Sequence, residues 1–212
     1  MVFQDRAHAG SLLARKLDKK KYRNAIVLAL PRGGVPVAQQ IAKYLSAPLD
    51  IIVVRKIGSP TQPEYGLGAI SEGEILILDN DRMINAGISK DNLTEIISSE
   101  KKELQRRVEI YRQNKKLDVK GKDVILVDDG LATGVTARAA AVATRKLGTK
   151  RITYAAPVCA RESTVELKKY VDEVVCLTKL DNMGAIGNYY NNFEQVSDEE
   201  VIKILSSCSL PD

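Results

Sequence analysis

The chain has 212 residues, of which 44% are hydrophobic and 28% are charged, which is enough for one domain with a sizeable core and excludes a disordered chain. Its formal net charge of +5 suits an anionic ligand and also leaves contact with nucleic acid open. No apolar run approaches the length of a membrane span, and the N-terminus lacks the layout of a signal peptide, so we expect a cytoplasmic protein. One histidine and three widely spaced cysteines disfavour a histidine-based metal site or a Ser-His-Asp triad and indicate reduced thiols.

Apolar segments alternate with amphipathic ones in the first quarter of the chain. The predicted helices span residues 5–20 and 35–45, and the predicted strands span 25–30 and 49–54. The strands are continuously apolar, a pattern typical of parallel strands that helices cover on both faces. This part of the chain therefore predicts an α/β fold.

The middle of the chain is less regular. Residues 55–75 are rich in Gly, Ser and Pro, which predicts a long, mobile loop of the kind that forms lids. A strand is expected at 74–79, followed by a long amphipathic helix over 89–116 in which acidic and basic residues alternate. The charges indicate a solvated face with helical salt bridges, while a dimer contact or an altered lid is the other interpretation.

Strands and helices alternate again to the C-terminus. A helix ends near Gly148, where glycine suits a left-handed cap, and Ser197 and Glu200 form a capping box for a last helix that continues to Leu205. We find no repeat or linker, so we expect a single domain over residues 1–212. The remaining predicted strands are 121–128, 152–156 and 174–177, and the remaining helix is 162–170.

The most informative stretch runs from Val124 to Thr136. Four apolar residues end in Asp128 and Asp129, a loop of small and hydroxyl residues follows, and then a helix begins. Loop amides and the positive end of the helix dipole can bind a phosphate, and the two carboxylates can accept hydrogen bonds from vicinal hydroxyls. The stretch predicts a site for a phosphorylated sugar. The alternative is an ordinary strand–turn–helix whose acids only cap the helix.

A second anion-binding element lies upstream. The run Leu30-Pro31-Arg32-Gly33-Gly34 follows a predicted strand and combines one cation with two glycines. The glycines let backbone amides approach an anion closely, and the Arg32 guanidinium is a planar fork for phosphate oxygens. The alternative is a generic turn with a surface arginine.

Together the two elements resemble the type I phosphoribosyltransferase family. Four hydrophobic residues, two acids, a short loop with Thr-Gly and a further Thr follow the order of that family's signature for phosphoribosyl pyrophosphate (PRPP). The sequence is most similar to the family's uncharacterised, predicted branch. The resemblance implies a three-layer α/β fold with a mostly parallel central sheet, a flexible loop and a small C-terminal hood at about 179–196. A helical insertion at about 80–118 departs from the family's usual path.

The resemblance also implies roles for the two elements. Asp128 and Asp129 would bind the ribose hydroxyls and help to hold Mg²⁺, mostly through ligand oxygens and water. Arg32, Gly33, Gly34 and Lys56 would bind pyrophosphate, with a cis peptide bond expected between Pro31 and Arg32. The catalytic set would be Asp128, Asp129, Arg32 and Lys56. The 5-phosphate would be wrapped by Leu131, Ala132, Thr133, Gly134, Val135 and Thr136.

Some roles have equally good alternatives. Lys56 and its neighbour Arg55 could be a solvated basic pair, and Glu64 and Tyr65 are speculative participants in the lid. In the hood, Ile186 or Tyr189 could stack on an acceptor base, with Arg161 as a weaker candidate for acceptor contact. Alternatively, the aromatic side chains of the hood only close the core.

The function that follows from the resemblance is displacement of pyrophosphate from PRPP by a nitrogenous base or amine. Mg²⁺ would be the cofactor, PRPP and a small-molecule acceptor the partners, and a homodimer the family's common form. The alternative is a non-catalytic regulator that senses PRPP or nucleotides and binds nucleic acid, although no basic stripe interleaved with aromatic residues supports nucleic-acid binding. Hydrolysis in the same pocket is a third interpretation. The sequence does not specify the acceptor.

Overall fold

The computed structural model describes residues 2–61, 65–73, 75–112 and 116–208. Its centre is a five-stranded sheet in the order β2-β1-β6-β7-β8, in which all neighbouring strands are parallel. The order reverses between β1 and β6, so the crevice beyond the carboxyl ends of these two strands is where a ligand site is expected. The strands are β1 (Ala25–Ala29), β2 (Leu49–Ile51), β6 (Asp123–Val127), β7 (Arg151–Ala160) and β8 (Glu173–Leu180).

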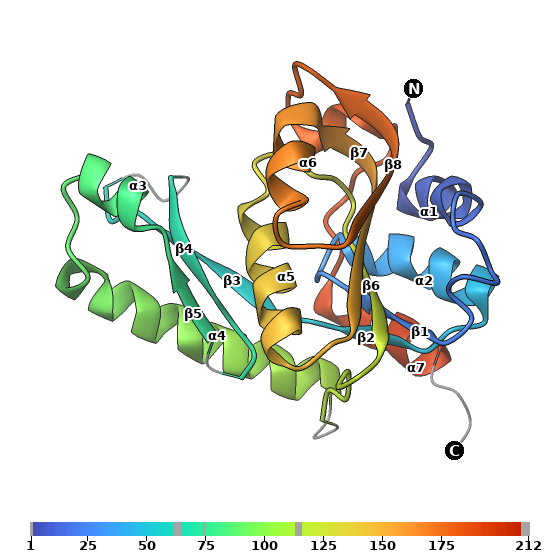
Figure 1. Cartoon of the computed structure of the whole chain (residues 1–212), viewed down its shortest axis with the longest axis horizontal. Coiled ribbons are helices and arrows are strands. Elements are labelled where there is room, and N and C mark those ends of the chain that lie inside the picture. Colours follow the sequence, from blue (N-terminus) through green and yellow to red (C-terminus); the bar gives the residue numbers. More distant parts are fainter. Residues whose placement is uncertain (1, 62–64, 74, 113–115, 209–212) are drawn as a thin grey trace.

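Helices cover both faces of this sheet, which confirms the predicted three-layer α/β fold (Figure 1). Alternate residues of one strand serve opposite faces: Val27 packs in the cluster beneath α1 and α2, and Leu28 packs in the cluster beneath α5. Because both faces are covered, the central strand β1 is apolar and buried at every position. The helices of these layers are α1 (Arg6–Ala14), α2 (Gly34–Leu45), α5 (Val135–Lys146), α6 (Arg161–Leu167) and α7 (Asp198–Ser207).

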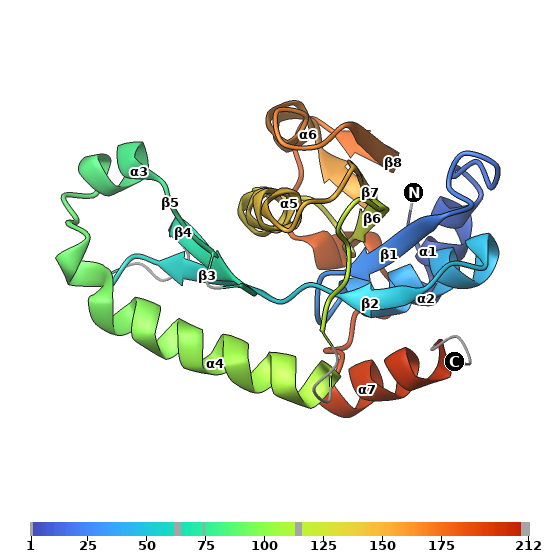
Figure 2. The same ribbon diagram turned by 60° about the horizontal axis from the view of Figure 1, so that its bottom comes forward.

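A second unit projects from the side of the sheet as an arm (Figures 1 and 2). It is an antiparallel sheet in the order β3-β4-β5, followed by two helices, and the longer helix, α4, runs along the whole arm. The arm comprises β3 (Val54–Gly58), β4 (Gly66–Ser71), β5 (Ile75–Leu78), α3 (Asn80–Asn85), a 3-10 turn (Asp91–Leu93) and α4 (Thr94–Arg112).

The arm corrects the prediction of a long mobile loop over residues 55–75. Most of that segment is two paired strands, in which Ile57 and Leu67 are fully buried. Gly68 allows close packing between strands rather than chain flexibility, since a Cβ at this position would lie 2.3 Å from the carbonyl oxygen of Ile77. A composition count cannot separate these two uses of glycine. Tyr65 is exposed immediately before β4, and Glu64 lies outside the described residues.

Helix α4 is shorter than predicted, and its charged side chains form ion pairs within the helix and with other elements. Glu103 pairs with Arg106 and Arg107 along the helix, as expected for helical salt bridges. Arg112, however, is buried and pairs with Glu72 and with Asp50, so it ties the helix to both sheets. Losing one partner of a buried pair leaves an uncompensated charge, so these contacts hold the arm to the core.

Several boundaries follow local signals and others do not. The Ser197 side chain caps α7 by accepting a hydrogen bond from the Glu200 amide, and Gly148 adopts a φ of 84°, both as predicted. The first helix ends at Ala14 rather than near residue 20, and β7 extends to Ala160 rather than 156. All three cysteines are free thiols. Among the described residues, no helix is long and apolar enough to cross a membrane.

Candidate active site

The two anion-binding elements meet at the carboxyl ends of β1 and β6. The amide of Leu30 donates to the carbonyl oxygen of Val127 at 2.8 Å, which joins the strand ends. A Cβ on Gly33 would lie 2.0 Å from Asp129 Oδ2, and a Cβ on Gly34 would lie 2.5 Å from the Val127 oxygen. No side chain fits at either position, so both glycines are required for the two loops to touch. The peptide bond between Pro31 and Arg32 is cis, as predicted.

Asp129 is buried and is held by a residue that sequence reasoning missed. Its Oδ2 accepts a hydrogen bond of 2.8 Å from Arg6 Nε, and Arg6 also donates to the carbonyl oxygen of Glu194 at 2.8 Å. The guanidinium carbon lies 3.8 Å from the centre of the Phe193 ring. Arg6 opens an otherwise ordinary helix, so no local signal could have identified it.

The two acids share one buried corner. Asp128 Oδ1 accepts a hydrogen bond of 2.8 Å from the Asp129 amide. Burial and the neighbouring Asp129 charge raise the pKa of Asp128 well above its usual range. Burial also raises the pKa of Asp129, while Arg6 opposes that rise. Cations or hydroxyl donors that reach this corner would therefore be bound favourably.

The loop after the acids is held by β7. The amide of Leu131 donates to the carbonyl oxygen of Val158 at 2.8 Å, and the Leu131 carbonyl oxygen accepts from the Ala160 amide at 2.7 Å. The Leu131 side chain is buried. Assigning Leu131 as a phosphate donor was therefore wrong, because its only amide hydrogen is used within the sheet. The candidate donors narrow to residues 132–136.

The rest of this loop leads directly into α5. Gly134 precedes the helix with a φ of 73°, and the apolar side chain of Val135 is buried, so Val135 offers only its backbone amide as a donor. Thr133 is exposed, and the Ser163 hydroxyl donates to the carbonyl oxygen of Ala132. A cavity of about 220 Å³ opens beside the loop; its lining comprises Arg82, Thr133, Gly134, Val135, Arg138, Ser163, Glu166 and Leu167.

The two side chains predicted to bind pyrophosphate, Arg32 and Lys56, lie on different elements. Arg32 Nη1 is 3.6 Å from Asp198 Oδ1, at the start of α7, and the Arg32 side chain is 25% exposed. Lys56 lies on β3 of the arm. Lys56 Cδ and Val135 Cγ1 both lie within 3.5 Å of the point that a Cβ on Gly66 would occupy. The structure thus places the stem of Lys56 beside the first residue of α5.

The predicted acceptor residues lie over the same end of the sheet. A Cβ on Gly130 would lie 2.8 Å from Ile186 Cγ2, so Ile186 packs directly on the loop that follows the acids. Tyr189 is half-buried, and Arg161 is exposed and pairs with Asp181 at 2.5 Å. Tyr190 is buried, and its hydroxyl donates to the carbonyl oxygen of Asp129 at 2.6 Å. The hood aromatic Tyr190 thus closes the core behind the acids.

The donor set suits Mg²⁺ only if a ligand shares it. In the parts of the chain that the structure describes, no group of three or more His, Cys, Asp or Glu side chains could hold a metal. Mg²⁺ commonly takes one or two carboxylates, with phosphate oxygens and water completing its six ligands. Asp128 and Asp129 fit that partial role, because their shared corner favours a nearby cation.

Comparison with known proteins identifies the family of the chain. The phosphoribosyl transferase domain family matches residues 4–193. A "Putative phosphoribosyl transferase" of Mycobacterium tuberculosis is 40% identical over 205 residues, which cover 96% of this chain and 46% of that protein. The chain therefore spans about half the length of the curated relatives it matches.

Solved structures resemble the whole chain. A crystal structure of a protein from Thermus thermophilus is 40% identical, with a TM-score of 0.84, and the match covers 99% of this chain and 100% of that one. A hypothetical protein from Neisseria gonorrhoeae with bound ppGpp, at 11% identity, a TM-score of 0.50 and coverage of 97% and 96%, shares the fold alone. On this family match over residues 4–193, the chain belongs to the phosphoribosyltransferase domain family.

Proposed function

We propose that the protein transfers the ribose 5-phosphate group of PRPP to a nitrogenous base or amine and releases pyrophosphate, with Mg²⁺ as cofactor. One observation carries the proposal: the Arg32 loop and the Asp128–Asp129 loop meet without intervening side chains at adjacent strand ends. The first loop supplies a cation, and the second supplies two carboxylates followed by backbone and hydroxyl donors.

The reaction needs no covalent group from the protein. The bond between C1 of the ribose and the pyrophosphate oxygen breaks, and its electron pair leaves with the pyrophosphate. The acceptor nitrogen forms the new bond with its lone pair and then releases its proton. The family's transition state is oxocarbenium-like, so the chain's task is to place the reactants and to stabilise charge.

Each proposed side chain has one part in this task. Asp128 and Asp129 orient the ribose and offset positive charge at C1. Arg32 and Lys56 stabilise negative charge on the departing pyrophosphate. The amides of residues 132–136 and the hydroxyls of Thr133 and Thr136 hold the 5-phosphate. Mg²⁺, when bound by the two acids and the ligand, would supply further charge neutralisation on the pyrophosphate.

The acceptor would bind beneath the hood. Ile186 packs on Gly130 next to the acids, so an acceptor ring that stacks on Ile186 or Tyr189 would reach the ribose. Arg161 is the proposed polar contact at the same end of β7.

The test is calorimetric titration of the intact protein and of the Asp128→Asn/Asp129→Asn variant with PRPP and Mg²⁺. We expect micromolar binding to the intact protein and none to the variant. An acceptor screen that detects released pyrophosphate would then identify the nucleophile. A folded intact protein that does not bind PRPP would refute the transferase proposal.

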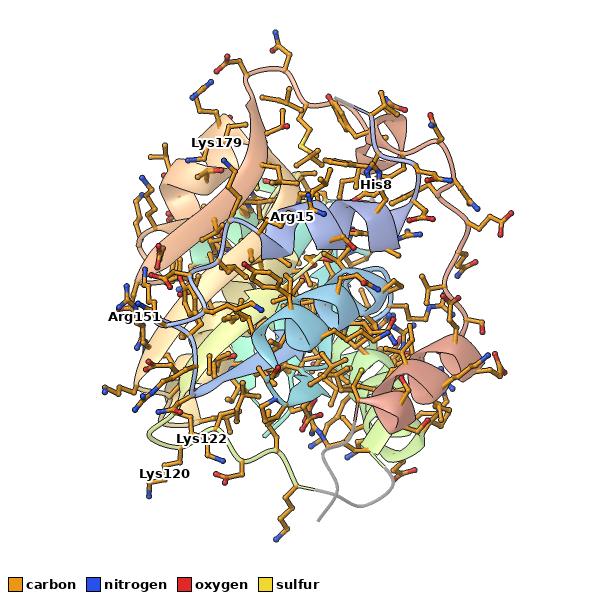
Figure 3. All side chains as sticks on the ribbon, turned by 90° about the vertical axis from the view of Figure 1, so that its right-hand side faces the viewer. His8, Arg15, Lys120, Lys122, Arg151 and Lys179 are labelled. Carbon is orange, nitrogen blue, oxygen red and sulfur yellow. The ribbon has the colours of Figure 1, made fainter. Side chains whose placement is uncertain are left out.

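A PRPP-sensing regulator is the competing function, and the same experiment separates them, since a sensor binds PRPP and releases no pyrophosphate with any acceptor. Its contact with nucleic acid would need a continuous basic surface. Figure 3 instead shows Lys179, Arg15, Arg151, Lys122 and Lys120 spread over one side of the molecule. Two of these pair with acids, Lys122 with Asp118 and Arg151 with Glu173.

We further propose that the protein is cytoplasmic and forms a homodimer. Light scattering of the purified protein would test its assembly state.

A further inference from the structure

Asp198, the first residue of α7, lies where three elements meet. The C-terminal end of α4 approaches the start of α7 beneath the central sheet (Figure 2). Asp198 Oδ1 accepts a hydrogen bond from the Tyr111 hydroxyl of α4, and the same oxygen is 3.6 Å from Arg32 Nη1. Asp198 Oδ2 accepts two hydrogen bonds of 3.3 Å from Arg106 of α4. One carboxylate thus links the helical insertion to the Arg32 loop.

The protonation states of this group are fixed near neutral pH. The hydrogen bond from Tyr111, followed by those from Arg106 and the nearby Arg32 charge, lowers the pKa of Asp198 below its usual value. Burial and the Asp198 carboxylate raise the pKa of Tyr111. Asp198 is therefore a carboxylate and Tyr111 a hydroxyl donor at any pH at which the protein would be assayed.

The three partners do not hold Asp198 equally. Tyr111 and Arg106 are within hydrogen-bond distance, whereas Arg32 at 3.6 Å makes an ion pair without a hydrogen bond. Arg32 can therefore leave Asp198 more easily than the α4 residues can. When it does, Asp198 keeps two partners, so no partly buried charge is left uncompensated.

We propose that Asp198 is a positioning residue that holds Arg32 while the site is empty and yields it to the pyrophosphate group of PRPP, with Tyr111 and Arg106 setting how strongly it competes. The proposal rests on the proposed function, because it takes Arg32 as the pyrophosphate ligand. It also gives the helical insertion a part in the site: α4 tunes the affinity for the leaving group without touching it.

The shared oxygen makes two substitutions act in opposite directions. Asp198→Asn removes the competing charge, so Arg32 is freer to bind pyrophosphate. Tyr111→Phe removes the hydroxyl that occupies Asp198 Oδ1, so that oxygen pairs more tightly with Arg32 and pyrophosphate binds more weakly. A general packing defect would weaken binding in both variants, so opposite signs distinguish the two explanations.

The experiment is calorimetric titration at low salt with inorganic pyrophosphate and, separately, with ribose 5-phosphate. We expect pyrophosphate to bind about threefold more tightly to Asp198→Asn and about threefold more weakly to Tyr111→Phe, the scale of a partly exposed charge pair. The Tyr111→Phe/Asp198→Asn double variant should match Asp198→Asn, since the hydroxyl acts only through the carboxylate. Ribose 5-phosphate affinity should not change, and added salt should shrink the pyrophosphate differences.

Two further variants serve as controls. Glu199→Gln removes an acid from the same helical turn that makes no ion pair with Arg32 in this structure, so it should change pyrophosphate affinity less than Asp198→Asn does. Arg32→Gln should weaken pyrophosphate binding and abolish the gain from Asp198→Asn.

The possible results separate this inference from the proposed function. Intact protein that binds both ligands, with Asp198→Asn and Tyr111→Phe either unchanged or shifted in the same direction, would overturn the exchange of partners and leave the transferase proposal standing. Intact, folded protein that binds neither pyrophosphate nor PRPP would overturn both.

Discussion

The two loops that meet at the site hold their donors in different ways. The loop after Asp129 offers mainly backbone amides, and hydrogen bonds from Leu131 to β7 fix its course. The loop after β1 offers the Arg32 side chain, whose place depends on Asp198 from the far end of the chain. A backbone site is organised by strand geometry, whereas a side-chain site can be adjusted by distant partners. This contrast predicts which substitutions harm each half of the ligand.

The largest expected effect is at the contact between the loops. In Gly34→Ala, the new Cβ would lie 2.5 Å from the Val127 oxygen and 2.9 Å from Asp128 Cα, both backbone atoms that cannot turn away. We expect a loss of about 3 kcal/mol in unfolding free energy and about 100-fold weaker PRPP binding, measured by denaturant unfolding and calorimetry.

The matched control for this change is Gly121→Ala. Gly121 has a φ of 71° and no heavy atom within 4 Å of the new Cβ, so it adds backbone strain far from the site. It should cost about 1 kcal/mol and leave PRPP affinity unchanged. Equal losses of affinity in the two variants would contradict the requirement for loop contact.

Arg6→Gln tests the cation that pairs with Asp129 and supports the loop after it. The Arg6 and Asp129 side chains are only 11% and 12% exposed, so the variant leaves a nearly buried carboxylate without its ion pair. We expect unfolding free energy to fall by about 2 kcal/mol, after allowance for water at the pair. Chemical denaturation measures it, and Arg6→Lys should recover part of the loss. No difference between the two variants would show that packing on Phe193, rather than charge, is what Arg6 provides.

Gly134→Ala tests most directly whether the two loops bind different parts of the ligand. Its φ of 73° disfavours any side chain, although the nearest atom to the new Cβ, on Ser163, is at an ordinary 3.5 Å. The strain of about 1 kcal/mol should distort the proposed phosphate loop and weaken ribose 5-phosphate binding about fivefold. Pyrophosphate binding, measured in parallel, should change little. An equal loss for both ligands would mean that the two loops respond as one unit.

The smallest effect runs in the stabilising direction. The folded protein raises the pKa of Asp128 above its value in the unfolded chain, so folding takes up protons and stability increases as pH falls through the folded pKa toward about 4. Ionising the buried Asp128 destabilises the folded protein, so Asp128→Asn should raise the melting temperature by a few degrees at neutral pH while weakening PRPP binding.

Thermal melts of the parent protein and of Asp128→Asn between pH 7 and 5 check this prediction. The gain from Asp128→Asn should be larger at pH 7 than at pH 5, because a lower pH favours the uncharged form of the native acid. A variant that is less stable than the parent at neutral pH would show that hydrogen bonding, not charge, dominates at Asp128.

The features that could be read from the sequence are local ones. Glycines at 33 and 34, the acids at 128 and 129 and the Thr-Gly loop are each contiguous, and their spacing alone encodes a strand end followed by an anion loop. The apolar strands likewise predict a parallel sheet, because burial on both faces leaves a continuous hydrophobic run. The cis bond at Pro31 was expected from the family resemblance rather than from residue chemistry.

Features that depend on distant residues could not be read in this way. Arg6 reaches Asp129 across 123 positions, and the Gly-rich segment before residue 75 forms paired strands that pack on α4 and α5. Leu131 matches the phosphate signature, yet β7 takes its amide. The sequence by itself determined the sheet and the two loops, because each arises from neighbouring residues. Only the tertiary structure decided which charges partner Arg32 and Asp129, because such pairs form only after the helices pack.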